Sequence, residues 1–330
     1  MDTAKYRQDG ARAAEKQRKL QEGIAEADKQ QKGKEQPGFA MQAGAREYPV
    51  PPMEKTKLEK PGIEAQLQQQ PMCDAPYYKG SDKLKDKVAI ITGGDSGIGR
   101  AVAVLFAREG ADVAVIYLCE HGDAQETKRM VEQEGRKCLL ISGDVSHREF
   151  CFDAVKDVVG ELGRLDVLVN NAAFQLHAHE LEDLSEAHFD TTLRTNLYGY
   201  FHMVQAAVPH MKPGSAIVNT GSVTGMMGSK DLLDYSLTKG GIHAFTRSLG
   251  TKLVPKGIRV NAVAPGPVWT PLNPADKEKE GIAQFGADVP MKRPAQPEEI
   301  APAYVFLASP HCSSYITGEV LPIIGGYSGG

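Results

Sequence analysis

The chain has 330 residues, of which 41% are hydrophobic and 24% are charged, and its formal net charge is −4. This balance is typical of a globular protein and excludes a broad basic surface for nucleic acid. No apolar run reaches the roughly 18 residues of a membrane span, and the polar N-terminus lacks the apolar stretch of a signal peptide. We therefore expect a cytoplasmic protein with no nucleic-acid partner and no membrane partner.

Residues 1–80 differ in composition from the rest of the chain. Residues 1–36 are rich in Lys, Gln, Glu and Ala, and residues 37–80 contain seven of the twenty prolines but few large aliphatic side chains. Such a segment buries too little apolar area to offset its ordering entropy. We predict a polar, Pro/Gly-containing N-terminal arm over residues 1–80, partly disordered, which packs either on the body or on a neighbouring subunit.

From Val88 onward, short apolar runs alternate with helical patterns. Most of the runs are continuously apolar, which favours a parallel sheet covered by helices on both faces. Right-handed crossovers then give a doubly wound α/β sheet, a Rossmann fold, over residues 81–330. Ligands of such sheets bind beyond the carboxyl ends of the strands. The predicted strands are 88–91, 113–118, 138–141, 165–169, 216–219, 258–262 and 319–323, and the predicted helices are 99–109, 124–134, 148–162, 196–210, 235–254 and 297–308.

A glycine-rich loop joins the first predicted strand to the first predicted helix. Its sequence is Thr92-Gly93-Gly94-Asp95-Ser96-Gly97-Ile98-Gly99. Glycines at these spacings allow a tight turn and close backbone approach, and the helix N-terminus offers free N–H groups to a pyrophosphate. The alternative is an ordinary glycine turn, but the position between strand and helix favours a dinucleotide site.

Polar residues follow the next three strands. The second strand ends in Tyr117-Leu118-Cys119-Glu120. An acid at its end would select the ribose hydroxyl of NAD and a base would select the 2′-phosphate of NADP, but neither stands at the deciding position, so both cofactors stay open. Glu120 is either slightly late for this role or a plain loop charge. Asp144 either caps a helix or contacts the adenine, and Asn171 either holds backbones apart beside a cofactor or makes a turn.

Tyr235 and Lys239 lie four residues apart on one predicted helix and so share a face. A phenol is a poor base at neutral pH, but a nearby ammonium and an oxidised nicotinamide favour its phenolate, which then exchanges a proton with a substrate oxygen. Ser222, just past the fifth strand, can polarise the same oxygen. Asn196 could hold a water that relays protons through Lys239, although a polar residue within a helix usually has no such role.

This ordered set resembles the short-chain dehydrogenase/reductase family over about residues 84–327. The resemblance implies a catalytic tetrad of Asn196, Ser222, Tyr235 and Lys239 and a nicotinamide dinucleotide cofactor. Two positions depart from the family pattern: Ala173 stands where Gly is frequent, and Gly221 where Ser is frequent. The implied cofactor-binding residues are Gly93, Asp95, Ser96, Gly97, Ile98, Gly99, Tyr117, Asp144, Val145, Asn171, Ala172, Tyr235, Lys239, Pro265, Gly266, Val268 and Thr270.

Several motifs together are similar to a subgroup that contains general-stress oxidoreductases and plant glucose and ribitol dehydrogenase homologues. They are Thr92–Gly97, Leu232–Tyr235, Ala264–Leu272 and Pro290–Arg293, preceded by an arm with Pro-Gly turns. The resemblance implies an aldehyde, sugar or polyol substrate, a stress-related role, and a homodimer or homotetramer.

The substrate is expected over the nicotinamide, between residues 174–177, 223–233 and 271–291. His177 or His179 could contact substrate hydroxyls, although exposed loop histidines are more often bystanders. Residues 273–285 carry alternating Lys and Glu and are interpreted as a mobile helical lid.

No residues outside this set indicate further chemistry. The cysteines form no CxxC motif and no Cys/His cluster, which favours free thiols and no metal site. Two hypotheses remain: an active NAD(P)-dependent oxidoreductase, or a stress-protective nucleotide-binding protein without turnover whose arm is the working part. The five cysteines are Cys73, Cys119, Cys138, Cys151 and Cys312.

Overall fold

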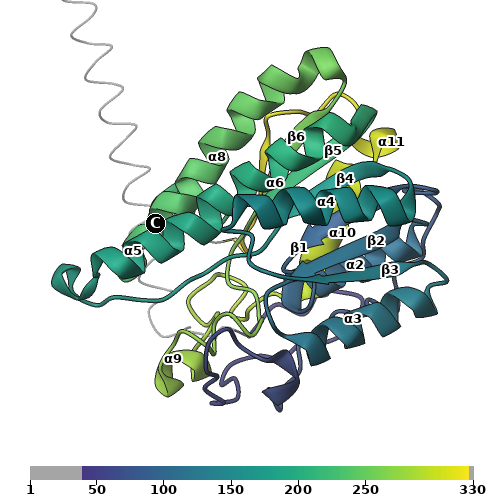
Figure 1. Ribbon diagram of the computed structural model, residues 1–330. Helices are drawn as coiled ribbons and strands as arrows, with labels where there is room; N and C mark the ends of the chain where they lie inside the picture. The colour runs from purple at the N-terminus through teal and green to yellow at the C-terminus, as the bar shows by residue number, and fades with distance from the viewer. Residues whose placement is uncertain (1–38, 327–330) are drawn as a thin grey trace, which may run out of the picture. The chain divides into compact units, whose positions relative to one another are not determined.

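The computed structural model describes residues 39–326, and its compact unit begins at Met41 (Figure 1). A seven-stranded parallel sheet forms the centre of this unit, in the order β3-β2-β1-β4-β5-β6-β7. The predicted doubly wound α/β fold is therefore confirmed. The strands are β1 (Val88–Thr92), β2 (Asp112–Tyr117), β3 (Cys138–Ser142), β4 (Leu165–Asn170), β5 (Met211–Thr220), β6 (Arg259–Pro265) and β7 (Val320–Ile323).

Helices cover both faces of the sheet. On one face, Ala89 and Ile91 of β1 pack in a core with α2 and α10, and on the other face Val88 and Ile90 pack in a core with α4 and α6. Alternate residues of one strand thus serve opposite cores, which explains why the strands are apolar throughout. The helices are α2 (Gly97–Arg108), α3 (His121–Gln133), α4 (Arg148–Leu162), α5 (Glu186–Leu193), α6 (Gly199–Ala207), α7 (Thr224–Met227), α8 (Leu233–Leu253), α9 (Lys279–Ala283), α10 (Pro297–Ala308) and α11 (Pro310–Ser313).

Local signals explain several boundaries. Helix α10 begins at Pro297 because Gln296 and Glu299 form a reciprocal capping box and proline suits the first helical position. The predicted helix 196–210 is wrong at its start: helix α5 begins at Glu186, and a π-helical turn over Arg194–Tyr198 connects it to α6. Few aliphatic residues occupy 186–195, so the apolar period was weak there, although Ser185 caps α5 by accepting from the His188 amide at 3.2 Å.

Residues 41–80, which we call the N-terminal segment, belong to the same compact unit as the sheet. Their secondary structure is limited to one 3₁₀ turn, η1 (Glu64–Gln66). Main-chain hydrogen bonds tie the segment to late parts of the chain, from the Met53 amide to Ala283 O at 2.8 Å and from the Leu58 amide to Pro274 O at 3.0 Å. The buried apolar side chains of the segment are Tyr48, Met53, Leu58, Leu67, Cys73 and Ala75.

The prediction of a partly disordered arm over residues 1–80 stays a prediction for residues 1–38, which lie outside the described residues. For residues 41–80, the structure shows packing on the body of the same chain. Within residues 39–326, none of the helices has the length and apolar character that crossing a bilayer requires.

Candidate active site

A cleft of about 1190 Å³ opens beyond the carboxyl ends of the strands. It includes the ends of β1 and β4, which are neighbours in the sheet although β2 and β3 lie between them in sequence. Doubly wound sheets bind their ligands at such a switch point. Every predicted cofactor residue except Gly99 lines this cleft, as do Ser222, Tyr235 and Lys239 of the predicted tetrad.

The glycine-rich loop forms a cradle that side chains would fill. Gly93 has a φ of +60°, and a Cβ there would lie 3.0 Å from the Cα of Ala172. A Cβ on Gly99 would lie only 1.9 Å from the Gly93 carbonyl oxygen, so a glycine at position 99 is what allows helix α2 to pack this closely against the loop. In the first turn of α2, the amides of Ile98 and Gly99 have no acceptor inside the helix, whereas the Gly97 amide donates to the Glu64 carboxylate at 2.7 Å. The cradle and these amides fit the pyrophosphate of a dinucleotide.

Asn171, just after β4, connects the ends of β1 and β5 beside this cradle. Its Nδ2 donates to Gly93 O at 3.0 Å, and its Oδ1 accepts from the Thr220 hydroxyl at 3.2 Å. The Thr92 hydroxyl accepts from the amides of Asn171 and Ala172 at 2.9 and 3.1 Å. Of the two alternatives for Asn171, the structure therefore favours the first: its side-chain amide holds the neighbouring backbone segments in place, and it does not merely make a turn.

Three acids line the side of the cleft where β2 and β3 end. Asp144 Oδ1 accepts from the Ser146 amide at 2.8 Å, so this residue organises the turn before α4 and also faces the cleft. Glu120 is buried and lines the cleft, and its carboxylate accepts from the Cys119 amide at 2.8 Å, so it is more than a plain loop charge. Burial raises the pKa of Asp95 to about 7, and the nearby Glu120 adds to this shift.

Tyr235 and Lys239 are both buried on α8 and face the cleft. The Lys239 Nζ donates to Thr220 O at 2.8 Å and lies 5.3 Å from the centroid of the Tyr235 ring. Burial lowers the pKa of Lys239 to about 7. Burial also raises the pKa of Tyr235, against a lowering by the Ser222 hydroxyl, so the expected lowering of this phenol's pKa is not found in the cofactor-free protein.

Ser222 lies just beyond β5, where the chain turns into α7. Its Oγ accepts from the Thr224 amide at 3.1 Å and contacts the Thr224 hydroxyl at 3.0 Å. The neighbouring departure at Gly221 has a steric cause, because a Cβ there would lie 2.2 Å from Nε2 of His243.

Asn196 is fully buried in the π-helical turn and does not line the cleft. Its Oδ1 accepts from the Phe174 amide at 2.8 Å, and its Nδ2 donates to Phe174 O at 2.9 Å and to the Thr238 hydroxyl at 3.1 Å. These contacts engage both ends of the side chain and fix the Phe174 backbone, and the water-holding role of Asn196 stays a prediction.

Asp276 organises the substrate end of the cleft, and the sequence analysis did not select it. Its carboxylate accepts from the Gln175 amide group at 2.6 Å and from the His177 backbone at 2.8 Å, and lies 2.7 Å from His177 Nδ1. These donors hold the pKa of Asp276 below its ordinary value in spite of burial. His177 is therefore bound to a carboxylate, and His179 Nδ1 lies 3.5 Å from Asp231.

The predicted lid, residues 273–285, contains the short helix α9 and is anchored on its inner side. Ile282 and Phe285 pack in a buried cluster with Trp269 and with Met53 of the N-terminal segment. On its outer side, Lys57 pairs with Glu278 at 2.6 Å.

The N-terminal segment also enters the cleft, which the sequence analysis did not predict. Lys60, Pro61 and Gly62 line it. The Lys60 Nζ donates to Gln175 O and lies 5.4 Å from the centroid of the Phe174 ring. Burial lowers the pKa of Lys60 to about 8, although Asp276 acts in the opposite direction. The partner of this lysine lies more than a hundred positions away in the sequence, so no local pattern predicts that Lys60 belongs to the site.

Residues 93–328 match the family model described as "Enoyl-(Acyl carrier protein) reductase". With the fold and the site above, this match shows that the chain belongs to the short-chain dehydrogenase/reductase family and is an oxidoreductase. A solved short-chain dehydrogenase from Burkholderia cenocepacia J2315, in complex with NADP, is 33% identical with a TM-score of 0.69, over 74% of this chain and 98% of that one.

Three relatives are similar over most of their length. General stress protein 39 of Bacillus subtilis is 53% identical over 84% of this chain and 97% of its own. Two Arabidopsis thaliana proteins, glucose and ribitol dehydrogenase homolog 2 and the chloroplastic NADPH-dependent aldehyde reductase 1, are each 50% identical over 81% of this chain and 94% and 95% of theirs. The predicted resemblance to this subgroup is confirmed.

Proposed function

We propose that the protein is an NAD(P)-dependent oxidoreductase that moves a hydride between nicotinamide and an aldehyde, sugar or polyol, with Tyr235 as general acid/base. The observation that carries the proposal is that Tyr235, Lys239 and Ser222 face the same cleft as the glycine cradle. A proton-transfer group beside a dinucleotide site is the arrangement that carbonyl reduction requires.

The glycine-rich loop would hold the pyrophosphate, and Asn171, Val268 and Thr270 would line the nicotinamide end. When bound, the dinucleotide would supply or accept the hydride. Tyr235 donates its phenolic proton to the substrate oxygen during reduction and accepts it back during oxidation. Ser222 contributes a second hydrogen bond to the same oxygen, which is worth most in a site shielded from water.

Lys239 has two effects on this proton transfer. Its ammonium lies beside the Tyr235 ring, so a positive charge there favours the phenolate. Thr220 O holds the Nζ in place at 2.8 Å. Because burial lowers the Lys239 pKa to about 7, the lysine is able to exchange protons near neutral pH.

Two observations bear on the choice of nucleotide. Glu120 at the end of β2, with the Asp95 side chain of the glycine-rich loop beside it, places acidic groups in the cleft that favour a ribose hydroxyl over a phosphate. The NADP complex of the Burkholderia protein and the NADPH named for the Arabidopsis reductase favour the phosphate. We therefore propose NAD or NADP as the cofactor. The assay described next, run with each dinucleotide, distinguishes the two.

The test is a panel of aldehydes, sugars and polyols, measured by nicotinamide absorbance with each cofactor. We expect turnover of at least one member. Binding of NAD(H) and NADP(H) without any turnover across the panel would instead support the nucleotide-binding stress-protective alternative. No binding of either dinucleotide would refute both.

We also propose a cytoplasmic homodimer or homotetramer that assembles through the π-helical turn with α6, through α8 and through β7. Large apolar side chains on the π-helical turn, α6 and α8 are exposed in the single chain, among them Tyr198, Phe201 and Leu237. Light scattering after gel filtration measures the oligomer, and a monomer would contradict this part of the proposal.

A further inference from the structure

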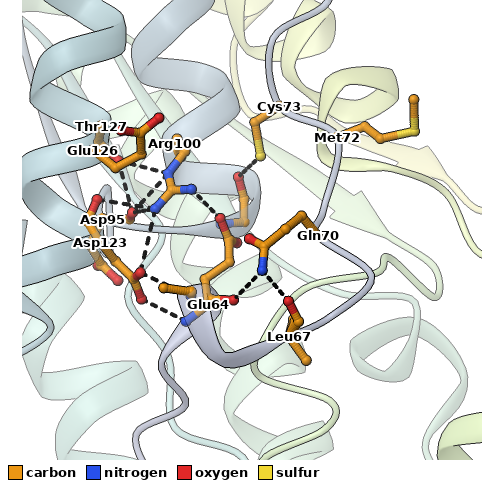
Figure 2. A network of polar contacts seen from close by, with 12 residues as sticks. Glu64, Leu67, Gln70, Met72, Cys73, Asp95, Arg100, Asp123, Glu126 and Thr127 are labelled. Atoms are coloured by element: carbon orange, nitrogen blue, oxygen red, sulfur yellow. Dashed lines mark hydrogen bonds and ion pairs between the residues drawn. The ribbon is translucent and has the colours of Figure 1, made fainter. Parts of the chain in front are cut away.

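Glu64 of the N-terminal segment reaches the glycine-rich loop. Its Oε2 accepts from the Gly97 amide at 2.7 Å, and its Oε1 pairs with Nη1 of Arg100 (Figure 2). Glu64 is completely buried, and Arg100 is nearly so. A buried carboxylate needs such partners, because an unpaired charge in the interior is costly.

The N-terminal segment binds Gly97 at both of its polar backbone atoms. Besides the amide bond to Glu64, the Gly97 carbonyl accepts from Sγ of Cys73 at 3.6 Å. Gly97 is the first residue of α2 and has a φ of +48°, and the preceding Ser96 makes no side-chain capping bond. Glu64 therefore acts as the cap of α2 from a distant part of the chain, where a negative charge also suits the helix dipole.

Arg100 extends this contact to the rest of the loop. Its Nε and Nη2 donate to Asp95 O at 3.1 and 2.7 Å, and its Nε also donates to the Thr127 hydroxyl at 3.0 Å. The guanidinium is thus the clamp that fixes the Asp95 carbonyl within the glycine-rich loop. Glu64 pairs directly with this buried guanidinium, and the Asp123 carboxylate lies 3.9 Å from its Nη2.

The backbone of Glu64 is itself fixed. The amides of Glu64 and Ala65 donate to the two carboxylate oxygens of Asp123 on α3 at 2.6 and 3.1 Å. The side chain of Gln70 donates to Glu64 O at 3.0 Å, which closes the turn around η1 (Figure 2). The carboxylate therefore presents a fixed geometry to the loop, rather than a mobile surface charge.

We propose that Glu64 is a positioning residue for the dinucleotide, which sets the binding shape of the glycine-rich loop through Gly97 and Arg100. The inference rests on the proposed function, since it concerns affinity for the same cofactor. It predicts that changes at Glu64 weaken dinucleotide binding, and leave the rate at saturating dinucleotide nearly unchanged, because Glu64 does not face the substrate end of the cleft.

Glu298 provides a matched control. It is also completely buried, pairs with an arginine of the N-terminal segment, Arg46, and accepts from a backbone amide of that segment, Ala75, at 2.8 Å. Glu298 lies on α10 and does not line the cleft. Its replacement therefore removes a comparable tether of the same segment without touching the glycine-rich loop.

The experiment measures the Kd of NADH and NADPH by fluorescence titration of the full chain and its variants. Glu64→Gln removes the carboxylate that binds Arg100 directly and leaves Asp123, 3.9 Å from Nη2, in place, and Glu64→Asp keeps a carboxylate but cannot reach Gly97 and Arg100 together. We expect each to raise the Kd and the dinucleotide KM on the order of tenfold, the loss typical of one charged hydrogen bond, with kcat within about twofold. Glu298→Gln is expected to lower Tm while leaving the Kd within about twofold.

Two results would overturn the inference. If Glu64→Gln or Glu64→Asp folds and binds the dinucleotide as tightly as the parent, Glu64 is only a structural tether. If Glu298→Gln weakens binding as much as the Glu64 variants do, the effect belongs to the whole segment and not to Glu64. Absence of dinucleotide binding by the parent chain is a separate outcome, because it refutes the proposed function itself.

Discussion

Gly99→Ala tests the glycine cradle most directly. The added Cβ would lie 1.9 Å from the Gly93 carbonyl oxygen and 2.8 Å from the Gly94 Cα. Both neighbours are backbone, so no side chain can rotate away. Restoring a contact of about 3.4 Å requires the loop and helix α2 to separate by roughly 1.5 Å. A misplacement of about 1 Å in a site can cost on the order of a hundredfold, and we expect the dinucleotide Kd to rise by that factor.

The assay is a fluorescence titration with NADH and NADPH, together with thermal unfolding to confirm that the variant is folded. Gly160→Ala is the matched control, because Gly160 lies within α4 and its added Cβ would meet no atom within 4 Å. That variant should bind normally and gain up to about 1 kcal/mol in stability, because alanine favours a helix interior. Binding by Gly99→Ala within twofold of the parent would refute the cradle as the dinucleotide site.

Three further predictions concern the proton-transfer groups and the substrate loop. Tyr235→Phe should retain dinucleotide binding and lose at least about a hundredfold in kcat, and turnover at the parental rate would remove Tyr235 as the acid. The pKa of Lys239 falls from 10.5 unfolded to about 7 folded, so at this group the unfolded chain binds more protons between these values, and Lys239 contributes a stability that rises with pH across them. Urea unfolding of the cofactor-free protein measures that slope, and Lys239→Met should flatten it; an unchanged slope would contradict the lowered pKa. Asp276→Asn should raise the KM for the carbonyl substrate about tenfold with an unchanged dinucleotide Kd, and equal losses in both would place Asp276 outside the substrate end.

The sequence predicted those parts of the fold in which local pattern and final environment agree. Strands β1, β4 and β6 are buried along their whole length, so apolar runs such as Val88–Ile91 predict a central strand directly. Helices α4 and α10 match the predicted ranges because apolar periodicity and, for α10, a proline at its first position coincide with their ends. Helix α5 was missed because its sequence is largely polar, with only Thr192 fully buried.

The residues of the candidate site also divide into those that local sequence patterns predict and those that only the folded chain brings together. The glycine-rich loop, Ser222 and the Tyr235–Lys239 pair follow from spacing, since a strand–loop–helix junction and one helical turn are local features. Glu64, Lys60 and Asp276 were not selected, because their partners lie between 33 and 115 positions away in the sequence. Asn196 was selected, but only the folded chain shows that its amide is bound to the Phe174 backbone.

The path of the N-terminal segment has a consequence for biosynthesis. Residues of the N-terminal segment are translated long before their partners: Arg46 pairs with Glu298, 252 positions later, and the Leu58 and Met53 amides bind Pro274 and Ala283. The nascent chain must therefore keep a stretch with several apolar side chains exposed while strands β1 to β6 are translated. Contacts of such long sequence separation form slowly, and the exposed stretch is open to chaperones and to misassociation until its partners have been translated.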